Sequence, residues 1–162
     1  MTDFVIEQLV TRSKNIDVTL KKAGLILATV ISACLALFLQ LFLWVTMVLC
    51  IVDYVLFRRM NVEYEYAYFN GDLDIDKIMN KESRKRVFSV NVKEMEVIAP
   101  TGSDVLRPFQ QLKQLDYSTK SPDGKTYELV TKFKGEKVRV VFEPNEKMLS
   151  AMRDLVPRKV VF

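Results

Sequence analysis

The chain has 162 residues and a net charge of +4, which allows one compact domain with a membrane segment. That charge suits a surface near anionic lipid but is too small to indicate nucleic-acid binding by itself. No histidine is present, so His-dependent metal sites and catalytic triads are excluded. The two cysteines, Cys34 and Cys50, lie in an apolar stretch, so the rest of the chain has no disulfide framework.

The first 17 residues form a short segment of their own. The run Phe4–Val10 mixes apolar and charged side chains, and Thr2 is a suitable cap for a helix. We therefore expect residues 1–17 to form a short helix in the membrane interface.

A long apolar stretch follows, from Ala23 to Phe57, in which Asp53 is the only charged residue among 35. As one helix it would measure about 52 Å, against a hydrocarbon core of about 30 Å. Two spans within residues 18–59, with a turn near Gln40, fit the bilayer better than one steeply tilted span. A single span remains the alternative.

The charges at the two ends of this stretch agree with a hairpin. Lys21 and Lys22 precede it, and Arg58 and Arg59 follow it. A hairpin places both pairs on one face of the membrane, which the positive-inside rule makes the cytoplasmic face. The sequence thus predicts a multi-pass protein of the cell membrane with both termini and the soluble domain in the cytoplasm.

Small residues recur every fourth position in the first predicted helix, at Gly24, Ala28, Ser32 and Ala36. Such a stripe allows close helix packing, either against the second helix of the hairpin or against a partner or another copy. Asp53 could serve transport, but it lies close to the interface, which favours a structural role.

Residues 60–162 are predicted to be the soluble domain, beginning with two strands. Tyr64 and Tyr66 alternate with glutamates, and Asn70-Gly71 then separates this run from a second one that ends near Asp76. This pattern predicts a β-hairpin with a type I′ turn. Glu65 and Asp76 would then repel one another unless a neighbouring strand brings Lys or Arg alongside.

The remaining pattern predicts further antiparallel strands and one helix. Strands are expected over 86–92, at Val97 and Ile98, and over 115–119, 127–133 and 138–142, with a loop over 101–114. Pro144 is expected to open a helix that ends before Pro157 and has one apolar face, consisting of Met148, Leu149, Met152 and Leu155. The fold class is a membrane α-helical hairpin plus an α+β domain, an antiparallel barrel or sheet with a C-terminal capping helix.

This order of elements resembles the bacterial pleckstrin-homology-like domains. The run Val62–Ile78, followed by Arg84–Val87, is similar to a family of short bacterial membrane proteins classed as a domain of unknown function. The resemblance implies topology and fold and carries no catalytic residues. Eukaryotic pleckstrin-homology domains bind phosphoinositides with a basic first loop, but here that loop is only Asn70-Gly71.

Candidate functional residues are few. Asp72, Asp74 and Asp76 alternate as in a calcium loop, but the intervening Leu73 and Ile75 indicate a solvated strand face. The basic cluster of Lys81, Arg84, Lys85 and Arg86 is either a solvated turn or, with Arg58 and Arg59, a membrane-surface contact. No cofactor, metal or catalytic motif is indicated.

The sequence favours a non-enzymatic, membrane-anchored interaction or scaffold module. Its expected partners are the lipid bilayer and either another protein or a second copy, while nucleic acid and a small-molecule substrate are not indicated. The alternative is an accessory subunit of a transporter or other membrane complex, acting through its transmembrane helices.

Overall fold

The structure is a computed structural model that describes residues 5–11, 16–60, 62–121 and 124–161. The side chains of residues 16, 17, 41 and 58–60 lie outside this description. The chain divides into two compact units. One is Ser13–Val62, and the other combines Met1–Arg12 with Glu63–Phe162.

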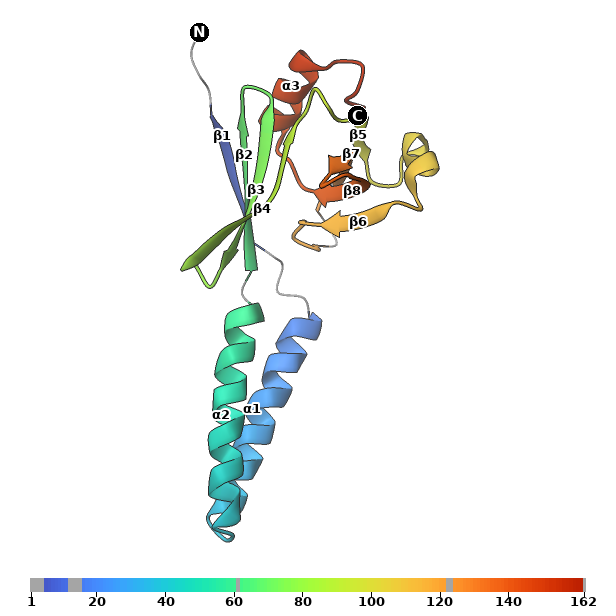
Figure 1. Cartoon of the computed structure of the whole chain (residues 1–162). Helices are drawn as coiled ribbons and strands as arrows, with labels where there is room; N and C mark the ends of the chain where they lie inside the picture. The colour runs from blue at the N-terminus through green and yellow to red at the C-terminus, as the bar shows by residue number, and fades with distance from the viewer. Residues whose placement is uncertain (1–4, 12–15, 61, 122–123, 162) are drawn as a thin grey trace. The chain divides into compact units, whose positions relative to one another are not determined.

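The first unit consists of two helices, α1 (Ile16–Ala36) and α2 (Leu41–Met60). They lie side by side as a hairpin (Figure 1). Their mutual faces combine steps of three and four residues, as helix pairs with a left-handed crossing do. The less exposed side chains of these faces are Val18, Lys22, Leu25, Thr29, Ser32 and Ala36 in α1 and Phe42, Thr46, Leu49, Asp53 and Phe57 in α2.

The predicted stripe of small residues coincides with this face only in part. Ser32 and Ala36 lie on it, but Gly24 and Ala28 are exposed, and a Cβ added at Gly24 would meet no atom within 4 Å. The interpretation that Gly24 and Ala28 pack against α2 is therefore wrong. Residues spaced four apart are displaced around the helix by about 40° at each step. A stripe with this spacing therefore cannot stay on a contact face whose residues are spaced about 3.5 apart on average.

The second unit contains two four-stranded sheets. Sheet 1 has the order β1-β2-β3-β4 and sheet 2 the order β5-β7-β8-β6. The strands are β1 (Ile6–Thr11), β2 (Val62–Phe69), β3 (Asp72–Met79), β4 (Ser83–Asn91), β5 (Val97–Pro100), β6 (Lys113–Asp116), β7 (Tyr127–Phe133) and β8 (Glu136–Phe142). The 3-10 helix η1 (Asp104–Phe109) follows β5, and α3 (Glu146–Leu155) follows β8.

Strand β1 corrects the prediction for the N-terminal segment. Instead of an interfacial helix, Ile6–Thr11 pairs antiparallel with β2, from Ile6 opposite Tyr68 to Thr11 opposite Glu63. Gln8 also donates a hydrogen bond to the carbonyl of Glu143 (2.8 Å) and accepts one from the backbone N–H of Asn145 (2.7 Å). The predicted cap Thr2 lies outside the described residues. Pairing with β2 gives this segment backbone hydrogen bonds along one side and a neighbour to pack against, whereas an isolated helix this short is marginal in water.

The pairing has a consequence for the topology. Because Thr11 lies opposite Glu63, the chain leaves the sheet and returns to it at adjacent positions. The helical hairpin is thus an insertion into the connection between two neighbouring antiparallel strands. The β-rich unit comprises residues from both sides of the hairpin, so residues 60–162 alone lack an edge strand.

The hairpin of β2 and β3 forms as predicted. Asn70 and Gly71 both have positive φ (49° and 97°), as a type I′ turn requires. Tyr66, Leu73 and Ile75 are fully buried. The Tyr66 hydroxyl donates to the carbonyl of Tyr117 (2.6 Å), which follows β6, so it links sheet 1 to the chain leaving sheet 2.

Sheet 2 differs from the prediction in one pairing. β6 begins at Lys113 and pairs in parallel with β8, so the expectation of antiparallel strands alone is wrong. The η1 segment makes this possible, because it carries the chain from the end of β5 to the start of β6 across the sheet. A small second core of Val97, Ala99, Leu106 and Val130 lies under it.

Helix α3 covers one end of the β-rich unit (Figure 1). Its cap is Asn145, whose side chain accepts a hydrogen bond from the N–H of Met148 (2.8 Å), so Pro144 precedes the cap. Met148, Leu149 and Met152 are buried as predicted, whereas Leu155 is 38% exposed.

Candidate functional site: a basic cavity between the two sheets

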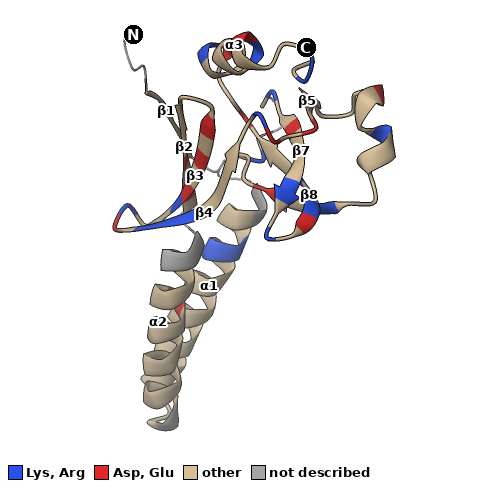
Figure 2. Ribbon diagram, turned by 45° about the horizontal axis from the view of Figure 1, so that its top comes forward, with Lys and Arg blue, Asp and Glu red and all other residues tan. Residues whose placement is uncertain are grey.

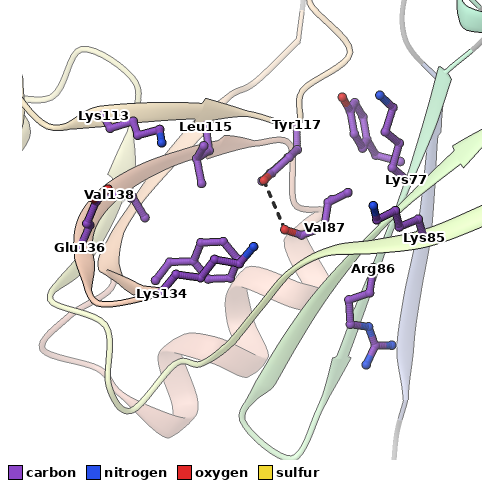
Figure 3. A pocket seen from close by; sticks show the side chains of 12 residues that line it. Lys77, Lys85, Arg86, Val87, Lys113, Leu115, Tyr117, Lys134, Glu136 and Val138 are labelled. Carbon is purple, nitrogen blue, oxygen red and sulfur yellow. Dashed lines mark hydrogen bonds between the residues drawn. The ribbon is translucent and has the colours of Figure 1, made fainter.

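A cavity of about 600 Å³ opens between sheet 1 and sheet 2 of the β-rich unit. Side chains from both sheets line it (Figure 3). The lining residues are Tyr64, Lys77, Lys85, Arg86, Val87, Lys113, Leu115, Tyr117, Phe133, Lys134, Glu136 and Val138. Five of them are cationic and one is anionic. The cavity therefore favours negatively charged ligands.

An irregularity in β4 directs its basic residues to opposite faces. Ile75 lies opposite Phe88, but the next residue, Asp76, lies opposite Arg86, so Val87 is an extra residue in β4. Such a bulge changes which face of the sheet each side chain reaches. As a result Lys85 faces the cavity on the same side as the buried Phe88, and its partner across the strands is Lys77.

The two arginines of the cluster bind carboxylates. Arg84 forms ion pairs with Glu65 and Asp76, and Arg86 with Asp74 (2.8 Å) and Asp76 (3.0 Å). The arginines thus provide the compensation that the predicted proximity of Glu65 and Asp76 required. They also cover Asp76, which is buried at 7% exposure rather than solvated as predicted.

The predicted surface cluster is therefore divided. Lys85 points toward the cavity, while the Arg86 guanidinium points away from it (Figure 3). Lys81 is exposed in the turn between β3 and β4, with a left-handed φ of 59°. Arg58 and Arg59 belong to the last turn of α2, and their side chains lie outside the described residues. Contact of the cluster with a membrane stays a prediction.

Sheet 2 supplies basic residues that the sequence did not single out. Lys113 begins β6, beside Val138 of β8, and Lys134 follows β7 in the tight turn with Gly135. The Lys134 ammonium lies 5.3 Å from the centre of the Phe133 ring. The three lysines Lys77, Lys85 and Lys113 have no ion-pair partner among the residues that the structure describes.

Aromatic side chains form the wall of the cavity. The rings of Tyr64 and Tyr117 meet edge to face, with centres 5.6 Å apart. Phe133 packs against the buried Phe88 with centres 5.0 Å apart, and Phe88 also contacts Tyr117 (6.2 Å). Burial raises the pKa of Tyr117, which keeps its hydroxyl neutral. The wall is therefore aromatic, while the exposed lysines of the lining form the rim.

Metal binding finds no support in this region. The described residues contain no group of three His, Cys, Asp or Glu side chains that could hold a metal ion. Asp74 and Asp76, two acids of the calcium-like pattern, are bound to Arg86 instead. The cavity presents ammonium groups beside an aromatic surface, and such groups can bind a ligand that has an anionic part and an apolar part.

The polar centre of the helical unit is a second arrangement of note. The Thr29 hydroxyl donates to Oδ2 of Asp53 (2.7 Å), and the hydroxyls of Ser32 and Thr46 lie 2.9 Å apart. Oδ1 of Asp53 is buried and has no hydrogen-bond partner among the described residues. Polar groups thus lie between the helices, where Thr29 and Ser32 face α2.

Two sheets and a C-terminal helix are consistent with a pleckstrin-homology-like (PH-like) fold. The comparison of sequences agrees with this class: the family described as "Bacterial PH-like domain (DUF6106)" matches residues 2–162. The chain belongs to this family. No curated protein and no solved structure shows a significant match. The predicted resemblance to a PH-like family with an N-terminal helical segment is therefore confirmed at the level of the family.

Proposed function

We propose that the protein is a membrane-anchored, non-enzymatic binding module, in which the helical hairpin is the anchor and the PH-like unit binds a ligand or partner. PH-like domains are generally non-catalytic binding modules, and the chain carries no recognised catalytic motif. The observation that carries the proposal is the distribution of polar and apolar side chains on the two helices.

The hairpin is apolar outside and polar inside. Leu37, Phe38 and Trp44 are 84%, 84% and 71% exposed, and large apolar side chains continue along both helices. The contact face, by comparison, holds the Thr29–Asp53 hydrogen bond. A soluble hairpin has the opposite arrangement, because water drives apolar surface inward. Lipid removes that force, so polar groups pair between helices instead.

The lengths of the helices support the same conclusion. Val18–Ala36 is long and apolar enough to cross a membrane, and its 19 residues measure about 28 Å. The apolar part of α2, Phe42–Phe57, measures about 24 Å, a mismatch that a bilayer accommodates by local thinning or tilt. Apart from Asp53, the span of both helices between their basic ends is uncharged (Figure 2).

The charges at the helix ends support one orientation in the membrane. Lys21 and Lys22 stand near the start of α1, Arg58 and Arg59 near the end of α2, and the turn over residues 37–40 has no charge. The positive-inside rule then favours a cytoplasmic location for the β-rich unit.

The anchor can be tested by extraction. Membranes containing the full chain are washed with alkaline carbonate and then solubilised with detergent. We expect the chain to stay in the membrane through the carbonate wash and to leave it only in detergent. A variant in which Leu27, Val30, Val48 and Ile51 are all changed to Asn should be released by carbonate. Release of the unaltered chain would contradict an anchoring role.

A second candidate function, an accessory subunit of a membrane complex, is favoured by the exposed Gly24 and Ala28 on α1. Replacing α1 and α2 by an unrelated two-helix anchor separates the two functions. A binding module keeps its cross-linked partners after the exchange, whereas a subunit that acts through its helices loses them.

A further inference from the structure

We infer that the cavity between the two sheets binds a phosphate-bearing amphipathic anion, with the phosphate at its lysine rim and an apolar group on its aromatic wall. This inference deepens the proposed function by naming the ligand class. The cavity lies within the β-rich unit, so its ligand binding can be measured separately from membrane insertion.

The charges of the rim indicate an anion with more than one negative charge. Lys77 and Lys85 stand opposite each other on β3 and β4, although like charges directly across strands are destabilising. Neither has a carboxylate partner among the described residues, whereas Arg84 and Arg86 next to Lys85 are fully paired on the other face. A structural role would pair these lysines as well, so their mutual repulsion points to a ligand that relieves it.

Lys113 and Lys134 add two further ammonium groups from sheet 2. Glu136 is the one carboxylate of the lining, which leaves a surplus of positive charge even when the paired Arg86 is disregarded. Lysine is a compact point charge with three donors and is a common phosphate ligand, whereas planar bidentate recognition would use arginine.

The size and wall of the cavity indicate that the ligand is more than a bare phosphate ion. A water molecule occupies about 30 Å³ of liquid volume, so 600 Å³ corresponds to about twenty waters. This volume falls within the usual range for sites that hold organic ligands. Tyr64, Tyr117 and Phe133 present ring surface to this space, and such surface binds an apolar group by stacking and by exclusion of water.

Phosphates of this kind come from two sources, a lipid headgroup or a soluble phosphate ester. The test therefore uses the full chain in nanodiscs of neutral phosphatidylcholine, with the methyl groups of Leu and Val labelled for NMR. Phenyl phosphate is the probe, and inorganic phosphate and phenol each supply one half of it. Leu115, Val87 and Val138 report on the cavity, while Leu106 and Val97 report on the separate core under η1.

We expect phenyl phosphate to shift the three cavity methyl signals in a saturable manner and to bind more tightly than either half. Lys85→Ser with Lys113→Ser should weaken binding about tenfold or more, since each removes a charged contact. The matched control changes Lys125 and Lys147, exposed lysines outside the lining, to Ser and should bind as the unaltered chain does. The spectra without probe verify that both variants are folded.

A second set of nanodiscs with phosphatidylglycerol identifies the source. Shifts of the cavity signals without added probe, lost in the Lys85/Lys113 variant, assign the site to a lipid headgroup. Shifts with phenyl phosphate alone assign it to a soluble ester. The proposal is overturned if neither changes the cavity signals, or if the control variant loses binding equally. Such a result would leave carbonate resistance unchanged, so it would not be mistaken for failure of the anchor.

Discussion

Substitution of Gly71 tests the fold, because a side chain at this residue would be destabilising for two separate reasons. It has a φ of 97°, a region in which residues with a side chain are strained by about 1–2 kcal/mol. In addition, a Cβ at this position would lie 2.9 Å from Cδ2 of Leu155, so that side chain must move. Gly102 has a similar φ of 87°, but a Cβ there would meet no atom within 4 Å.

Comparison of Gly71→Val with Gly102→Val thus separates the steric clash with Leu155 from the backbone strain that both variants share. Overpacking costs about 1–3 kcal/mol, and the lower end applies here because Leu155 is 38% exposed and can turn aside. We expect Gly71→Val to lower the free energy of unfolding by about 2–3 kcal/mol and Gly102→Val by about 1–2 kcal/mol. In Leu155→Ala the difference between the two should shrink by about 1 kcal/mol.

The assay is urea unfolding of the full chain in neutral nanodiscs, followed by pulse proteolysis, which reports on the β-rich unit. Circular dichroism in the absence of urea verifies that each variant is folded. Equal losses for the two glycine variants would show that Leu155 does not pack on the turn. An unchanged difference in the Leu155→Ala background would refute the contact as the cause.

Three further predictions concern the β-rich unit. Gln8→Ala should lower its stability by about 1–3 kcal/mol and speed amide exchange in β1, because two hydrogen bonds are lost; unchanged exchange would contradict the role of β1. Burial raises the pKa of Tyr66, so this tyrosine ionises at a lower pH in the unfolded chain than in the folded one. The free energy of unfolding should therefore fall as the pH rises above about 10. Urea midpoints measured from about pH 8 to about pH 11 should fall less steeply in Tyr66→Phe than in the unaltered chain. Arg84→Gln should lower the urea midpoint, because it leaves the buried Asp76 with one cation, whereas Lys81→Gln should leave the midpoint unchanged. Equal urea midpoints for the two variants would refute this.

Local patterns in the sequence predicted most elements of the β-rich unit. The Asn70-Gly71 pair predicts the first hairpin, and the strand expected over 127–133 matches β7 to the residue. The predicted register places Glu65 near Asp76, so a cation is needed to relieve the repulsion between their carboxylates, and Arg84 provides it. These features depend on residues close in sequence or on strict periodicity, which a single chain displays directly.

Features that depend on distant residues were not predictable in the same way. The sequence predicts a helix in place of β1, because a strand of six residues shows too few alternations to be recognised and its partner strand begins only at Val62. The bulge at Val87 cannot be seen in the sequence, so four basic residues read as one cluster although Lys85 faces away from its arginine neighbours. Lys113 and Lys134 join the cavity only through the pairing of sheet 2.

Insertion of the hairpin into the membrane is the central claim, and site-directed cysteine labelling tests it most directly. Cys34 and Cys50 are first changed to Ser, and single cysteines are then placed at Thr2, Gln40 and Phe162 in the full chain. With a membrane-impermeant reagent on intact cells, we predict labelling at Gln40 alone. Labelling at either terminus, or no labelling at Gln40 while lysed cells label at all three positions, would contradict a hairpin with a cytoplasmic PH-like unit.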